Sequence, residues 1–61
     1  MYEIRYKDIN PDTGDVSNDS PIAICQSENW ANIIKDLIIK DYMEVESDPN
    51  RDFYIKETVS N

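Results

Sequence analysis

The sequence predicts an α+β fold of order ββαββ, in which one amphipathic helix packs on one face of a single, mainly antiparallel four-stranded sheet. Two observations predict this fold. Apolar residues recur at every second position near both ends of the chain, and at helical spacing in the middle. The 61 residues suffice for a single small domain, 1–61. Because such a domain buries only about 60% of the surface of its unfolded chain, partner binding or dimerisation would add stability.

The first strand is expected over residues 2–9, where apolar and polar side chains alternate. A period of two with aromatic and β-branched residues is typical of a half-buried strand. One face of this strand would carry Tyr2, Ile4 and Tyr6, and the other Glu3, Arg5 and Lys7.

A chain reversal and a second strand follow. In the segment 10–14, Asn-Pro-Asp-Thr-Gly, Pro11 presets φ for a turn and Gly14 can adopt a positive φ. The polar residues 15–20 are predicted to be mostly loop. The second strand is expected over 21–25, where the proline stands at the first position and a missing N–H is tolerated.

A helix is predicted to begin after Ser27 and to run to residue 40. Ser27 is a good N-cap, and Glu28 places a negative charge in the first turn, where it suits the helix dipole. One face carries a continuous apolar stripe of Trp30, Ile33, Ile34, Leu37 and Ile38. We expect this stripe to be buried against the sheet.

After residue 40 the apolar period returns to two and predicts a second hairpin. Met43 and Val45 alternate with acidic residues, and the segment 47–50, Ser-Asp-Pro-Asn, is typical of a turn. Residues 53–59 then alternate again. The predicted core comprises Tyr2, Ile4, Tyr6, Ile22, Ile24, Trp30, Ile33, Ile34, Leu37, Ile38, Met43, Val45, Phe53 and Ile55.

The counts of three residue types exclude several kinds of site. With one Cys, no His and one Gly, the chain has no internal disulfide, no Cys/His zinc site, no imidazole acid–base chemistry and no glycine-rich phosphate loop. Cys25 is interpreted as a small apolar residue at a strand end, because no His is present to activate its thiol. One helix on one sheet leaves little room for a catalytic cleft, so we expect no enzymatic activity, no catalytic residues and no cofactor.

The chain is strongly acidic, with a net charge of −7 from 13 acidic and 6 basic side chains. Residues 8–19 and residues 41–52 each carry a local charge of −4. Carboxylates repel phosphate backbones, which argues against direct binding to nucleic acid. They favour electrostatic steering towards a basic protein partner, although acidic surfaces also serve solubility.

These observations predict a small acidic protein-binding module that inhibits or regulates a basic, nucleic-acid-binding protein. Carboxylates on a rigid fold can imitate the phosphates of nucleic acid. Antitoxins, immunity proteins and anti-defence proteins of phages share this small size and acidic charge. Tyr42 and Tyr54 are expected on an exposed face of the sheet, and tyrosine is frequent at contact hot spots. The predicted partner-binding residues are Asp12, Asp15, Asp41, Tyr42, Glu44, Glu46, Asp48 and Tyr54.

Two alternatives remain open. Asp8, Asn10 and Asp12 bear oxygen atoms at alternate positions, as calcium loops do, although Gly14 is one place late for an EF-hand and the flanks are strands. The same residues serve turn geometry. The other alternative is a homodimer of structural or regulatory type, joined through a sheet edge or the open sheet face.

The sequence shows no secretion signal and no membrane-spanning stretch. The N-terminus lacks a basic and apolar leader, and polar and charged residues interrupt the apolar-rich segment 30–39. We therefore expect a cytoplasmic location without a membrane partner, and the single unpaired Cys is compatible with it.

Overall fold

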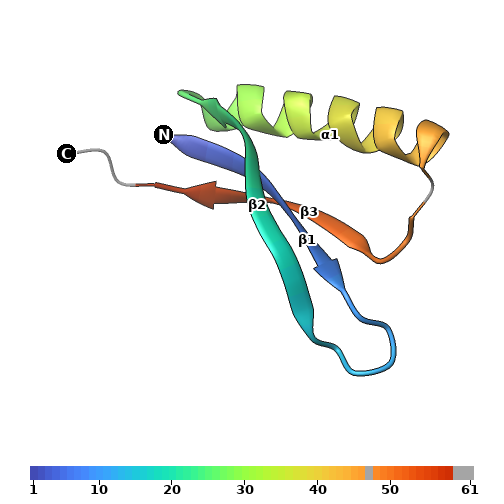
Figure 1. The fold of residues 1–61 in the computed structure, drawn as a ribbon. Helices are drawn as coiled ribbons and strands as arrows, with labels where there is room; N and C mark the ends of the chain where they lie inside the picture. The colour runs from blue at the N-terminus through green and yellow to red at the C-terminus, as the bar shows by residue number, and fades with distance from the viewer. Residues whose placement is uncertain (47, 59–61) are drawn as a thin grey trace.

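The computed structural model describes residues 1–46 and 48–58, which form an α+β fold of order ββαβ. The elements are β1 (Tyr2–Ile9), β2 (Val16–Cys25), α1 (Glu28–Val45) and β3 (Arg51–Glu57) (Figure 1). The predicted combination of an antiparallel sheet with one helix is confirmed for this part of the chain.

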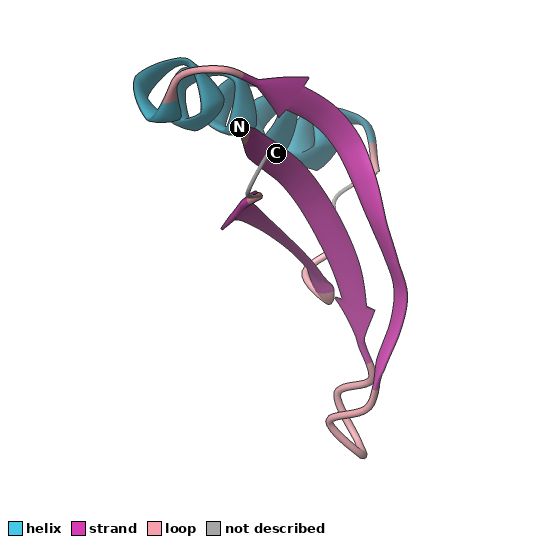
Figure 2. Cartoon of the chain, turned by 90° about the vertical axis from the view of Figure 1, so that its left-hand side faces the viewer, coloured by secondary structure: helices cyan, strands magenta, loops and turns pink. Residues whose placement is uncertain are grey.

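Strand β1 lies in the centre of a sheet whose described strands have the order β2-β1-β3. Both neighbours run antiparallel to it, so Ile4 lies opposite Ala23 of β2 and Ile55 of β3. Helix α1 covers one face at one end of the sheet, and the β1–β2 hairpin extends away beyond the helix (Figure 2). The core is therefore confined to the end of the sheet under α1.

The strand predicted around Met43 and Val45 is wrong, so the described part of the sheet has three strands instead of the expected four. Residues Met43–Val45 continue α1, and a hydrogen bond from Glu46 N to Tyr42 O at 2.8 Å closes the last turn. Ile38, Tyr42 and Val45 stand at i, i+4 and i+7, so the helical spacing of apolar residues extends past residue 40. The last strand consequently crosses the sheet to pair with β1 instead of closing a second hairpin.

Strand β2 is longer than predicted, because it begins at Val16. A register shift leaves Ile22 as an extra residue in β2, as in a β-bulge. Ile24 lies opposite Glu3, on the face away from α1, and is 61% exposed. The half-buried Ala23 takes the inward position, so the predicted burial of Ile24 is wrong.

The centre of the core is small. Ile4 of β1 and Ala31 of α1 are fully buried, and the short side chain of Ala31 lets the helix approach the sheet closely. Farther along α1 the half-buried residues Ile34, Ile38 and Tyr42 face the same way as Ala31. Trp30 and Leu37 lie on a neighbouring stripe and are each 62% exposed. Their predicted burial is wrong because the sheet covers only one of the two apolar stripes of α1.

The predicted start of the helix is confirmed. Ser27 is the N-cap, and its Oγ accepts a hydrogen bond from Trp30 N at 3.4 Å. Glu28 lies in the first turn, as expected for an acidic residue at the positive end of the helix dipole. Within the described residues, no helix has both the length and the apolar character that crossing a bilayer requires.

Candidate protein-binding site at the acidic end of the sheet

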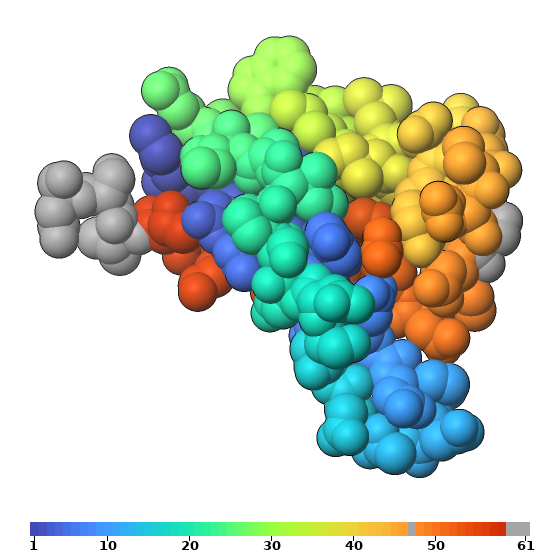
Figure 3. Space-filling model, viewed as in Figure 1, coloured from blue at the N-terminus to red at the C-terminus, as the bar shows by residue number. Residues whose placement is uncertain are grey.

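Two acidic segments that lie far apart in the sequence meet at one end of the molecule. Ile9 N donates a hydrogen bond to Asn50 O at 2.9 Å, which holds the turn before β3 beside the end of β1. The hairpin tip and the segment around residue 50 therefore lie close together at the lower right of the space-filling view (Figure 3). We call residues 8–15, 41–46 and 48–52 the acidic end. It holds eight carboxylates and one arginine, a formal charge of −7 that equals the net charge of the whole chain.

The arginine of the acidic end, Arg51, is already engaged. Its Nε donates to Asp8 Oδ1 at 2.8 Å and its Nη2 to Asp8 Oδ2 at 3.2 Å. The guanidinium carbon lies 4.3 Å from the ring centroid of Tyr6 and 5.0 Å from that of Tyr42. Arg51, and next the amide of Asn18, hold the pKa of Asp8 below its ordinary value. Arg51 thus neutralises one carboxylate and anchors β3 to β1.

The other carboxylates of this end have little compensation. Within the described residues, no ion pair involves Asp12, Asp15, Asp41, Glu44, Glu46 or Asp48. The last turn of α1 contains no basic residue, although carboxylates there face the negative end of the helix dipole, at a cost of about 0.3–1 kcal/mol each. Local stability therefore does not account for the acidic residues at the end of this helix.

An apolar groove lies between the C-terminal half of α1 and the sheet. Its volume is about 540 Å³, and the half-buried side chains of Tyr6, Ile38 and Phe53 contribute apolar surface to it. The exposed carboxylates of Asp41 and Glu46 line the same groove. The remaining lining residues are Ile22, Leu37, Tyr42, Val45 and Arg51. Such a groove suits a side chain that combines an apolar stem with a positive charge.

Aromatic packing gives the groove a fixed shape. Tyr42 meets Phe53 edge-on, with ring centroids 5.3 Å apart, and Tyr6 lies 6.5 Å from Phe53. Burial against the sheet raises the pKa of Tyr42 above its ordinary value. Tyr42 is therefore a half-buried wall of the groove, not an exposed residue of a sheet strand, because the helix extends past it.

The hairpin tip forms the turn that the sequence predicts. Asn10 Oδ1 accepts hydrogen bonds from Asp12 N at 2.9 Å and from Thr13 N at 3.4 Å, and Gly14 has a φ of 78°. Of the three residues considered for calcium, Asp8 is bonded to Arg51 and Asn10 to the backbone, and the side chain of Asp12 is exposed. The described residues contain no group of three or more His, Cys, Asp or Glu side chains placed to hold a metal ion.

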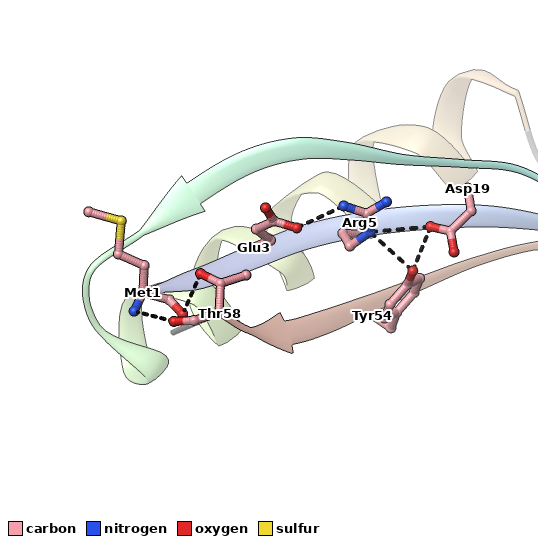
Figure 4. Close-up of polar contacts among 6 residues, drawn as sticks. All are labelled: Met1, Glu3, Arg5, Asp19, Tyr54 and Thr58. Atoms are coloured by element: carbon pink, nitrogen blue, oxygen red, sulfur yellow. Dashed lines mark hydrogen bonds and ion pairs between the residues drawn. The ribbon is translucent and has the colours of Figure 1, made fainter. Parts of the chain in front are cut away.

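Tyr54 lies away from the acidic end, on the open face of the sheet (Figure 4). Its hydroxyl donates to Asp19 Oδ1 at 2.5 Å and accepts from Arg5 Nε at 3.1 Å. Arg5 also pairs with Glu3 at 2.7 Å. The Asp19 carboxylate raises the pKa of Tyr54, and the Tyr54 hydroxyl, with Arg5, lowers that of Asp19. Tyr42 and Tyr54 thus lie on opposite faces, and the prediction of one shared tyrosine surface is wrong.

The sequence analysis did not identify Tyr6, Phe53 and Arg51 as residues of the candidate site, although all three line the groove. One signal was available, because Arg51 is the sole basic residue in the segment 41–52. Comparisons of the chain with protein-family models, with curated proteins and with solved structures find no match. The functional assignment therefore depends on the contacts of the acidic end.

Proposed function

We propose that this chain is a small, non-enzymatic protein-binding module that inhibits or regulates a basic, nucleic-acid-binding protein through its acidic end. One observation carries the proposal. The acidic end holds seven carboxylates besides Asp8, of which Asp41 and Glu46 line an apolar groove, and its one arginine is already paired with Asp8.

Charge gives the acidic end a role in association. Carboxylates concentrated at one end of a small protein attract a positive surface from a distance and raise the association rate. This attraction depends on salt, because the Debye length falls from roughly 30 Å at 0.01 M salt to about 10 Å at 0.1 M.

The groove adds a place for a specific contact. An arginine or lysine side chain has an apolar stem that Tyr6 and Phe53 can cover, and a charged head that Asp41 and Glu46 can bind. Surfaces that bind nucleic acid are rich in these two residue types. The acidic end would therefore occupy the phosphate-binding surface of the partner and compete with its nucleic acid.

Competitive capture tests this function. The immobilised chain is incubated with lysate of its native host at low salt, and bound proteins are identified with and without added duplex DNA. We expect a basic protein that added DNA displaces. We also expect retention to fall at least tenfold for the variant D12N/D15N/D41N/E46Q, which removes four negative charges from the acidic end.

A matched variant controls for net charge. The variant E28Q/D36N/E57Q removes three negative charges, all at exposed residues outside the acidic end, and is compared with the acidic-end variant D12N/D41N/E46Q, which also removes three. This control should retain the partner much better than the acidic-end variant. Equal losses in the two variants would argue that the charge serves only solubility, and a captured partner that DNA does not displace would argue against competition with nucleic acid.

A further inference from the structure

The outer stripe of α1 is apolar and has no cover. Trp30, Ile33 and Leu37 stand at i, i+3 and i+7, so they share one side of the helix. They are 62%, 51% and 62% exposed. We call these three residues the outer stripe, and it is distinct from the sheet-facing line that contains Ala31.

The monomer is less compact than a chain of its length normally is. Its radius of gyration is 12.4 Å, whereas the scaling for compact domains gives about 10.5 Å for 61 residues. Its accessible surface is 4508 Å², against about 4,100 Å² expected for a folded chain of 7.1 kDa. The smallest extent is only 12 Å. The fold therefore leaves more surface exposed than a compact monomer would, and the exposed residues include Trp30, Ile33 and Leu37.

We propose that two copies of this chain associate through their outer stripes, with the two α1 helices antiparallel about a two-fold axis. Apolar residues spaced three and four apart form the seam along which helices pack against each other. In a two-fold interface the same patch serves on both subunits, so an apolar stripe is its own complement.

Charge favours the antiparallel orientation. The outer stripe begins in the first turn of α1 and ends at Leu37, just past the middle of the helix, and the acidic residues Asp41 and Glu44 lie nearer the C-terminus. If Trp30 of one copy meets Leu37 of the other, Asp41 lies near the N-terminus of the opposing helix, where the dipole attracts a carboxylate. A parallel pair would instead bring two acidic ends together. The antiparallel pair keeps the two acidic ends apart, and it covers Leu37, which also lines the groove.

The area of the stripe is adequate for such a dimer. The exposed parts of its three side chains amount to roughly 350 Å² in each copy, counting about 150–250 Å² for a large aromatic residue. An interface of standard size takes about 800 Å² from each partner, of which roughly 60% is apolar. The outer stripe therefore supplies most of the apolar surface that a specific dimer needs.

Sedimentation equilibrium of the unmodified chain over a range of concentrations tests the proposal. We expect a transition from 7.1 kDa to twice that mass as concentration rises. The chain has one tryptophan, so the emission of Trp30 should shift to the blue over the same range as its exposed indole becomes covered. A monomeric mass up to millimolar concentration, or a dimer without an emission shift, would overturn the proposal.

Variants then locate the interface. Leu37→Glu should weaken dimerisation at least tenfold without loss of helical circular dichroism, because Leu37 is mostly exposed in the monomer. Val45→Glu is the matched control, since Val45 is 74% exposed on the same helix but lies outside the stripe. Equal dimerisation of the unmodified chain and the Leu37→Glu variant would show that another surface joins the copies, and would refute the outer stripe as the interface.

Cysteine cross-linking tests the orientation in a Cys25→Ser background. An Ile33→Cys variant should form a disulfide between copies, because Ile33 lies near the two-fold axis. An Asn29→Cys variant should not, because antiparallel helices separate the two Asn29 positions. Efficient cross-linking at position 29 would indicate parallel helices and contradict the proposed arrangement.

Discussion

Arg51 Nε donates a hydrogen bond to Asp8 Oδ1 at 2.8 Å, and this contact joins the start of β3 to the end of β1. The two residues are 43 positions apart in the sequence. Their side chains are only 28% and 21% exposed, and the guanidinium also covers the rings of Tyr6 and Tyr42. The side chain of Arg51 thus helps to set the register of β3 against β1, and it also holds the rings of Tyr6 and Tyr42 that line the groove.

The first prediction is that geometry, and not charge alone, makes Arg51 important. Arg51→Lys should lower the Tm nearly as much as Arg51→Ala, by about 5 °C, because lysine cannot form the two-pronged contact and stack on the rings. Thermal unfolding followed by circular dichroism measures both variants. A Lys variant as stable as the parent would show that Asp8 requires only a positive charge.

The second prediction is that the fold loses stability at low pH as Asp8 and Asp19 become protonated. Asp8 and Asp19 have pKa values lowered from 3.8, chiefly by the hydrogen bonds from Arg51 and Tyr54 respectively. The unfolded chain therefore takes up these protons first as pH falls. The stability that the two carboxylates contribute is present above pH 3.8 and is lost as pH falls through their folded-state pKa values.

Urea unfolding from pH 6 to pH 2 measures this effect. The decline in stability should be less steep in the double variant D8N/D19N than in the parent. Asp12→Asn is the control, because Asp12 has no ion-pair partner among the described residues. An unchanged slope in the double variant would mean that other groups govern the acid response.

The third prediction separates the core from the open face. Ile4→Ala should destabilise the fold by about 2–5 kcal/mol, because Ile4 is completely buried beneath α1. Ile24→Ala removes the same atoms from a residue of the same sheet that is 61% exposed, and should cost much less. Comparable losses in the two variants, measured by urea unfolding, would contradict the assigned register of β2.

The accuracy of the sequence predictions depended on whether an interaction is local. The turn at Asn10 and Gly14 and the helix start at Ser27 arise from contacts within a few residues, so short patterns sufficed to predict them. The pattern at Met43 and Val45 led to the wrong prediction of a strand. Two apolar residues in alternation are compatible with a strand and also with the edge of an apolar stripe on a helix. The order of the strands arises from distant pairing, which periodicity does not specify.

The candidate site was predictable in part for the same reason. Charge counts along the chain identify acidic segments, and these include Asp12, Asp41 and Glu46. That the segments meet depends on the contact between Ile9 and Asn50, which no local pattern indicates. The exposure of Trp30 follows from the width of the sheet, since three described strands cover one stripe of α1 where four were expected.

The fourth prediction is that calcium has little effect on stability. Asp8 is bonded to Arg51 and Asn18, and Asn10 Oδ1 is bonded to the backbone, so a calcium ion would have to break existing contacts. A real site would stabilise the fold by mass action. Melting curves in millimolar calcium and in chelator should therefore coincide. A rise of several degrees that Asp12→Ala abolishes would instead support a calcium loop.

The last prediction is that stability and binding oppose each other at the end of α1. Glu44 and Glu46 face the negative end of the helix dipole, and the last turn contains no basic residue. The double variant E44K/E46K should therefore raise the Tm by about 5 °C while it weakens binding to the captured partner. Glu28→Lys at the other end of the helix should lower the Tm, because it places a positive charge at the positive end of the dipole. Thermal unfolding and binding are measured on all three proteins.

If E44K/E46K binds as well as the parent, these carboxylates have no role in recognition, and the contact must depend on the groove residues Asp41 and Tyr42 or on the hairpin tip. If it binds weakly and is also less stable, the loss of binding is explained by unfolding and the proposed opposition is wrong.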